Sequence, residues 1–120
     1  MDNMLAGRRV LVVEDEMLIL MGAEDMLAAL GCEFVDGAST VDEAIALIEA
    51  QRFDAALLDV NLSGSSSDRV ADKLVERGVP FAFATGYSAR DGRHRHHDRP
   101  VLKKPFRHGE LVKVLTSLLR

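Results

Sequence analysis

Apolar runs of strand length alternate with longer amphipathic runs along this chain. The short apolar runs lie at residues 9–13, 32–35, 53–58, 81–84 and 101–102. Elsewhere, apolar residues recur every three to four positions, and this spacing predicts helices at residues 16–30, 41–48, 68–77 and 110–119. Ser39 or Thr40 is placed to cap the second of these helices. Such alternation is typical of an α/β fold with a mostly parallel sheet.

The first and last predicted helices each carry a set of apolar positions expected to face the core. In the first helix these are Met17, Leu18, Met21, Met26, Leu27 and Leu30. In the last helix they are Leu111, Val112, Leu115, Leu118 and Leu119. Gly31 follows the first helix directly and is a typical helix stop. Both helices are therefore expected to pack against the sheet.

Two segments lack a regular apolar pattern. Residues 61–67 are rich in serine and contain glycine, which predicts a solvated loop. Residues 87–99 show almost no apolar periodicity, so we expect at most a short helix there and the most mobile part of the domain. No repeat or linker interrupts the chain, and residues 1–120 are predicted to form a single domain.

Composition narrows the function classes. The chain is 48% hydrophobic, enough for a core, and its net charge of -4 disfavours direct nucleic-acid binding, which usually requires a clustered basic face. Cys32 is the one cysteine, so no intramolecular disulfide can form, which is compatible with a reducing cytoplasm. No signal peptide pattern and no apolar stretch near the ~20 residues of a membrane span occur. We expect a cytoplasmic protein without membrane contact.

Chemically active residue types follow four of the predicted strands. Glu14 and Asp15 follow the first strand, Asp59 the third, Thr85 the fourth and Lys104 the last. Ligands of open parallel sheets bind beyond the carboxyl ends of the strands, so we expect these side chains to converge at one edge. Carboxylates, a hydroxyl and an ammonium group together are typical of a metal-assisted phosphoryl site.

The acidic residues predict a Mg2+ site. Acids before a helix are common without any ligand, because the helix dipole favours them there. Asp59 changes the interpretation, because a third carboxylate at the same edge would add repulsion that a divalent cation relieves. Mg2+ prefers oxygen ligands and usually takes one or two carboxylates together with phosphate oxygens.

Asp59 is also a candidate nucleophile. A carboxylate that emerges from an apolar strand can attack phosphorus and form an aspartyl phosphate. Thr85 and Lys104 would then stabilise the charge on the equatorial oxygens of the transferred group. Gly86 leaves space beside the site for a phosphodonor.

Four motifs, in order, carry a family resemblance: VLVVEDE, ALLDVNLSG, FATGY and LKKPF. Together they resemble the receiver domain of bacterial two-component signalling. The resemblance implies a flavodoxin-like (CheY-like) doubly wound five-stranded parallel sheet of order 2-1-3-4-5 with helices on both faces. It also implies these roles: Asp59 as phosphoacceptor, Thr85 and Lys104 as phosphoryl contacts, and Glu14, Asp15, Asp59 and the backbone carbonyl of Asn61 as Mg2+ ligands.

The sequence departs from the common receiver pattern in the loop after Asp59 and at the switch position. Leu62-Ser63-Gly64 lacks the usual proline, and Val101 stands where an aromatic switch residue is common. The run from Phe83 to Tyr87 is instead similar to the atypical FATGUY receivers, many of them single domains linked to HWE-type histidine kinases. Thr85 and Tyr87 are therefore the expected switch residues, although Tyr87 is equally compatible with a surface role.

We therefore expect a Mg2+-dependent phosphoacceptor that is not an enzyme. Its expected partners are a histidine kinase, with the HWE type as one candidate, or a histidine phosphotransfer protein, and it would act by protein contact or as a phosphate sink. One alternative is a haloacid-dehalogenase-like phosphatase, which Asn61 disfavours because that family places a second aspartate there. The other is a degenerate receiver that only binds. The histidines at positions 94, 96 and 97 are interpreted as part of a solvated loop rather than a transition-metal site.

Overall fold

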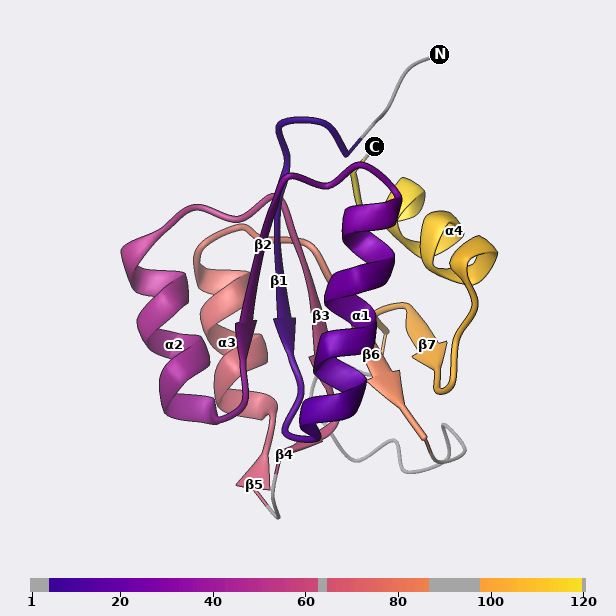
Figure 1. Ribbon diagram of the computed structural model, residues 1–120. Coiled ribbons are helices and arrows are strands. Elements are labelled where there is room, and N and C mark those ends of the chain that lie inside the picture. The colour runs from indigo at the N-terminus through magenta and orange to yellow at the C-terminus, as the bar shows by residue number, and fades with distance from the viewer. Residues whose placement is uncertain (1–4, 63–64, 87–97, 120) are drawn as a thin grey trace.

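The computed structural model describes residues 5–62, 65–86 and 98–119 and contains a five-stranded parallel sheet (Figure 1). Its strands, in spatial order, are β2 (Phe34–Ala38), β1 (Arg9–Val13), β3 (Ala55–Asp59), β6 (Phe81–Thr85) and β7 (Val101–Lys103). With the strands of this sheet numbered along the chain, the order is 2-1-3-4-5, as predicted. A separate antiparallel pair joins β4 (Asn61–Leu62) to β5 (Ser65–Ser66).

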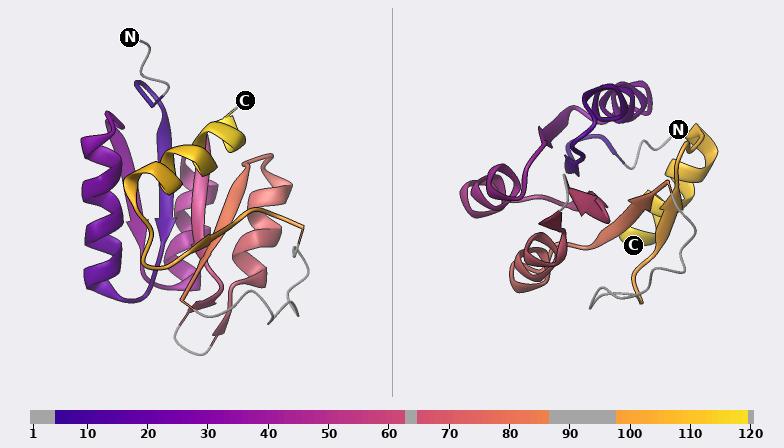
Figure 2. Two further views of the ribbon diagram at one scale, coloured as in Figure 1. Left: turned by 90° about the vertical axis from the view of Figure 1, so that its right-hand side faces the viewer. Right: turned by 90° about the horizontal axis from the view of Figure 1, so that it is seen from below.

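Helices cover both faces of the sheet (Figure 2). The described helices are α1 (Met17–Ala29), α2 (Val41–Ala50), α3 (Asp68–Glu76) and α4 (His108–Leu119). Helices α2 and α3 share one apolar cluster with the sheet, and α1 and α4 share the other. None of these described helices is long and apolar enough to cross a membrane.

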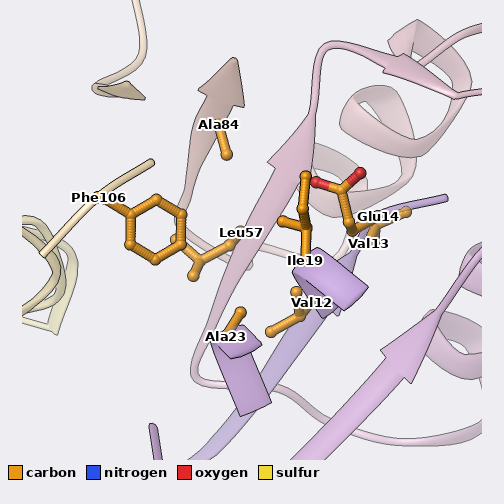
Figure 3. A pocket seen from close by; sticks show the side chains of 8 residues that line it. All are labelled: Val12, Val13, Glu14, Ile19, Ala23, Leu57, Ala84 and Phe106. Atoms are coloured by element: carbon orange, nitrogen blue, oxygen red, sulfur yellow. The ribbon is translucent and has the colours of Figure 1, made fainter. Parts of the chain in front are cut away.

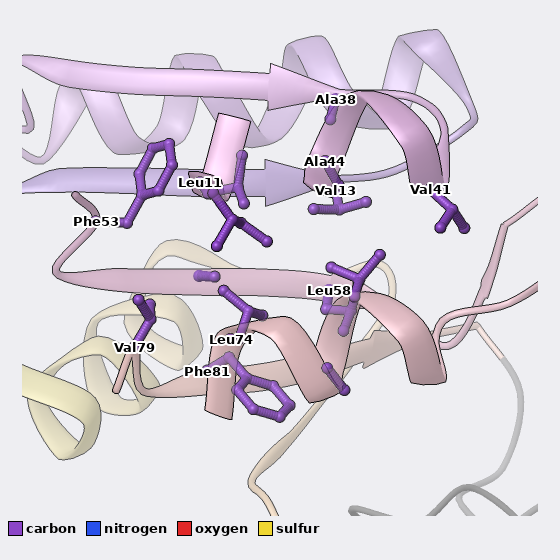
Figure 4. Packing of buried hydrophobic residues seen from close by; sticks show 14 of the residues in the cluster. Leu11, Val13, Ala38, Val41, Ala44, Phe53, Leu58, Leu74, Val79 and Phe81 are labelled. Carbon is purple, nitrogen blue, oxygen red and sulfur yellow. The ribbon is translucent and has the colours of Figure 1, made fainter. Parts of the chain in front are cut away.

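Strand β3 lies at the centre of the sheet between β1 and β6, and all five of its residues are buried. Leu11 and Leu58 point from β1 and β3 into the cluster on the α2–α3 face, where Leu74 of α3 meets them (Figure 4). A parallel strand covered on both faces needs side chains that are apolar on both sides, which explains the near-continuous apolar runs of β1, β3 and β6.

The second strand was predicted at residues 32–35 and begins later, at Phe34. The apolar pattern is misleading here because Asp36 and Gly37 lie within the strand. The Asp36 carboxylate accepts a hydrogen bond from the Arg9 guanidinium of β1 at 3.0 Å, which makes a charge acceptable at this position. Cys32 precedes the strand and is buried, as expected of a small apolar residue.

The predicted inward face of α1 is partly wrong. Leu20, Ala23 and Leu27 are buried, whereas Met17, Leu18 and Met21 are 58%, 84% and 52% exposed. Residues 17–21 are all apolar, so periodicity alone could not show which of them pack on the sheet.

The last helix follows its prediction more closely. Leu111 and Leu115 are fully buried, and Leu118 and Leu119 pack against the same cluster, but Val112 is exposed. The helix also starts two residues earlier than expected, at His108.

The remaining predictions concern the two polar segments. Residues 61–67 were predicted to form a solvated polar loop of turns, but they contain the β4–β5 pair and end at the buried Ser67. Most of residues 87–99, including Tyr87 and the histidines at positions 94, 96 and 97, lie outside the described residues.

Candidate phosphoacceptor site

Three carboxylates meet at the carboxyl edge of the sheet. Val13 pairs with Leu58 across β1 and β3, so Glu14, which directly follows β1, and Asp59, the last residue of β3, emerge side by side. Ligand oxygens of Glu14, Asp15 and Asp59 all lie within 4.8 Å of one another. Glu14 is 2% exposed and Asp59 is 8% exposed, so their mutual repulsion is only weakly screened by water.

Lys104 supplies positive charge to this cluster. Its Nζ lies 2.7 Å from Oε1 of Glu14 and 3.5 Å from Oδ2 of Asp59. The Lys104 backbone N–H donates to the carbonyl of Thr85 at 2.8 Å, and the following peptide bond to Pro105 is cis. Burial lowers the pKa of the Lys104 ammonium, but its hydrogen bond to the Glu14 carboxylate and the negative charge of Asp59 outweigh this effect, and the net result is a raised pKa. Lys104 is therefore positively charged at neutral pH.

Thr85 lies at the end of β6 on the same edge. Asp59 pairs with Ala84 across β3 and β6, so Thr85 is one position beyond the carboxylate. Thr85 is buried and pairs with Lys103 of β7, which holds Lys104 next to it. The strand ends thus bring together Glu14, Asp15, Asp59, Thr85 and Lys104, as the sequence predicted.

The backbone after Asp59 is held on two sides. The Val60 N–H donates to the carbonyl of Ala84 at 3.3 Å, and the Val60 carbonyl accepts a hydrogen bond from the Ser67 hydroxyl at 2.8 Å. Asn61, the predicted source of a carbonyl ligand, follows directly and begins β4. Ser67 was not predicted as a site residue, because it lies in a run of serines and such a run predicts solvated turns.

A small pocket adjoins the site between α1, the strand ends and Phe106 (Figure 3). Its lining is apolar except for Glu14 and includes Ile19 and Ala23 of α1 and Leu57 of β3. Such a lining offers few groups to orient a polar organic substrate. The arrangement favours chemistry at the carboxylates themselves over binding of a small molecule in this pocket.

The described residues fit a divalent cation. Glu14, Asp15 and Asp59 offer hard oxygen ligands at short mutual distances, and the ammonium of Lys104 already offsets part of their charge. Mg2+ suits such a set because it takes few carboxylates and retains several waters.

Comparison with known proteins supports this interpretation of the fold and the site. The sequence profile of the response regulator receiver domain matches residues 10–116. The chain is 45% identical to SdrG from Sphingomonas melonis Fr1, whose solution structure it matches over 100% of both chains with a TM-score of 0.83.

Two further relatives extend the comparison. The receiver domain of the sensor histidine kinase PA1611 from Pseudomonas aeruginosa PAO1, which has a magnesium ion coordinated in its active site cleft, is 27% identical. That match covers 95% of this chain and 98% of the other, with a TM-score of 0.81. The transcriptional regulatory protein PdtaR of Mycobacterium tuberculosis is 33% identical over 109 residues, which are 88% of this chain and 53% of PdtaR.

The chain therefore spans about half the length of the curated relatives it matches. The receiver profile covers most of the chain, and the strand order and the acidic edge are those that its motifs predict. The chain belongs to the response regulator receiver domain family.

Proposed function

We propose that this chain is a Mg2+-dependent phosphoacceptor with Asp59 as the acceptor. The observation that carries the proposal is the convergence of Glu14, Asp15 and Asp59 within 4.8 Å, with the Lys104 ammonium against two of them. Asp59 is the best nucleophile of the three because it ends the central strand and lies beside Thr85. Family membership also favours this function over a haloacid-dehalogenase-like phosphatase.

The proposed reaction transfers one phosphoryl group to a carboxylate oxygen of Asp59. That oxygen attacks phosphorus while the P–N bond to a histidine of the donor breaks, and the bonding electrons leave with the imidazole nitrogen. Bound Mg2+ supplies positive charge that offsets the carboxylates and the phosphoryl oxygens. Lys104 and Thr85 stabilise the remaining negative charge on the oxygens of the transferred group. The product is an aspartyl phosphate, and water later returns the carboxylate and inorganic phosphate.

A protein is the proposed phosphodonor, either a histidine kinase or a histidine phosphotransfer protein. Helix α1 begins two residues after Asp15 and exposes Met17, Leu18 and Met21 beside the site. Exposed apolar side chains that cluster on one element are typical of a protein contact. The run from Phe83 to Tyr87 supports a kinase of the HWE type.

Residues 1–120 are proposed to work as one receiver domain that signals by protein contact or drains phosphoryl groups from a partner. Thr85 and Tyr87 are the proposed switch residues. Val101 supports the assignment of these switch residues, because it occupies the position where receivers commonly carry an aromatic switch residue. It is exposed on the edge strand β7.

Intact-mass measurement tests the acceptor. Wild-type protein incubated with Mg2+ and acetyl phosphate should gain the mass of one phosphoryl group, and EDTA should prevent the gain. Asp59→Asn should gain nothing, whereas the matched change Asp54→Asn, directly before β3 at the opposite edge of the sheet, should label like wild type. Equal labelling of Asp59→Asn and wild type would contradict the proposal.

A further inference from the structure

Ser67 is a buried polar residue to which the phosphoacceptor chemistry gives no role. Its side chain is completely buried, although it lies in a run of serines. It occupies the N-cap position of α3, where a serine oxygen usually accepts a hydrogen bond from the first turn of the helix. Here the side chain makes no capping hydrogen bond. Helix capping therefore does not explain why a hydroxyl is buried at this position.

The hydroxyl instead bonds across the loop that follows the acceptor. Ser67 Oγ donates to the Val60 carbonyl at 2.8 Å, and the Ser67 N–H approaches the same oxygen at 3.4 Å. The intervening segment contains the β4–β5 pair, in which Asn61 is opposite Ser66. Ser67 thus joins the end of this segment to its beginning, one residue from Asp59.

This bond fixes the orientation of the backbone that leads into Asn61. The Val60 N–H is held by Ala84 of β6 and the Val60 carbonyl by Ser67, so the peptide groups on both sides of Val60 are restrained. The Asn61 carbonyl is in the next peptide group along the chain. Groups that orient a metal ligand influence affinity strongly, and their loss typically weakens metal binding about 10- to 100-fold.

We propose that Ser67 is a positioning residue for the divalent cation: its hydroxyl holds the Val60 peptide so that the Asn61 carbonyl is presented beside the carboxylates. This inference rests on the proposed function of the same site. It also assigns a physical substitute for the proline that the loop lacks. The β4–β5 pair, closed by one buried hydroxyl, restrains the chain where a fixed proline ring otherwise would.

The test is Mg2+ affinity without any phosphodonor, measured by calorimetric titration. Ser67→Ala should weaken Mg2+ binding about tenfold, and Ser67→Thr, which retains the hydroxyl, should recover most of that loss. Thr116→Val is the matched control, because Thr116 Oγ1 donates to the Val112 carbonyl at 2.7 Å within α4. This control should leave Mg2+ affinity unchanged even if it lowers the melting temperature.

Phosphorylation kinetics provide a second readout that a merely structural role would not change. Ser67→Ala should label slowly with acetyl phosphate at limiting Mg2+ and within about twofold of wild type at saturating Mg2+. Unchanged Mg2+ affinity of Ser67→Ala, with wild-type protein labelling normally, would overturn this inference alone. Wild-type protein that neither binds Mg2+ nor becomes labelled would overturn the proposed function and this inference with it.

Discussion

Helices α1 and α2 both begin at the carboxyl edge of the sheet and cover opposite faces, but their first turns differ. The first turn of α2 is closed by polar side chains: Thr40 accepts a hydrogen bond from the Glu43 N–H at 3.1 Å, and the Ser39 hydroxyl donates to Glu43 at 2.8 Å. At the start of α1, Glu16 is the N-cap residue and makes no side-chain capping bond. Glu14 accepts from the Glu16 N–H at 3.2 Å but also pairs with Lys104.

The apolar side chains of the two helices also differ in how far they are buried. Helix α2 buries Val41, Ala44 and Ile48, and all its large apolar side chains are at least partly buried. Helix α1 leaves Met17, Leu18 and Met21 exposed next to the acidic cluster. Helix α2 therefore contributes mainly stability, and the difference supports the proposal that the start of α1 serves the acidic site and a protein partner.

Truncation of a core residue of α2 should give the largest stability difference between the helices. Ile48→Ala should lower the free energy of unfolding by about 3 kcal/mol, because Ile48 is almost completely buried and a cavity would remain. Leu18→Ala in α1 should change it by less than about 0.5 kcal/mol. Urea unfolding measures both values. A Leu18→Ala loss as large as that of Ile48→Ala would remove the distinction between the helices.

Removal of the Lys104 charge should destabilise the α1 edge. Lys104→Met should lower the free energy of unfolding by about 2 kcal/mol at pH 7 without Mg2+, because Glu14 and Asp59 lose the positive charge that compensates them. This loss is smaller than that expected for a fully buried ion pair, because the site is partly screened by solvent. Added Mg2+ should reduce the difference by binding the folded state.

The same variant gives a pH dependence with a defined sign. The pKa of Lys104 is raised above its ordinary value of 10.5, so its stabilisation is fully present below that pH and is lost as the pH rises through the folded-state pKa. The difference between wild type and Lys104→Met, from urea unfolding, should be constant from pH 7 to about 9 and shrink above about 10.5. A difference that disappears already near pH 8 would show that the ion pair is not its source.

The exposed residues of α1 should matter for transfer more than for stability. The double variant Leu18→Ser, Met21→Ser should slow phosphotransfer from a protein donor about tenfold, which corresponds to ~1.4 kcal/mol of lost transition-state binding. Its labelling by acetyl phosphate should stay within about twofold of wild type, since the small donor needs no docking surface. The rates of phosphorylation by the protein donor and by acetyl phosphate, measured on one protein preparation, distinguish a lost docking surface from a damaged site. Equal slowing with both donors would mean that the variant damages the site itself.

A more modest loss of stability is expected at the cap of α2. Thr40→Ala should lower the free energy of unfolding by about 1 kcal/mol, because it removes the acceptor for the Glu43 N–H. Phosphorylation by acetyl phosphate with Mg2+ should be unchanged. Altered labelling would show that α2 also influences the site and would contradict the distinction between the two helices.

Much of this fold and most of the candidate site were predictable from the chain. Strands β1, β3 and β6 are buried apolar runs between amphipathic segments, and parallel pairing alone brings Glu14, Asp59 and Thr85 to one edge. Lys104 was predictable for the same reason, since it follows the short strand β7.

Other features depend on tertiary contacts that no local pattern encodes. The exposed face of α1 was missed because residues 17–21 are uniformly apolar, and the sheet decides which of them are covered. The end of β2 was not predicted because it contains Asp36, whose charge is paired with Arg9 on another strand. The Ser67 hydroxyl donates to the Val60 carbonyl, seven residues earlier in the chain, so the residues next to Ser67 predicted only a turn.

The central claim is that Asp59 carries the phosphoryl group, and chemical trapping tests it most directly. Borohydride reduces an acyl phosphate to an alcohol, so protein phosphorylated with Mg2+ and acetyl phosphate, then reduced and digested, should contain homoserine in place of the aspartate at position 59. Mass spectrometry of the peptide that contains β3 identifies the position of the homoserine. The homoserine-containing form of this peptide should be absent when EDTA replaces Mg2+. Homoserine at Asp15 or at another acidic residue, with the aspartate at position 59 unmodified, would contradict the account.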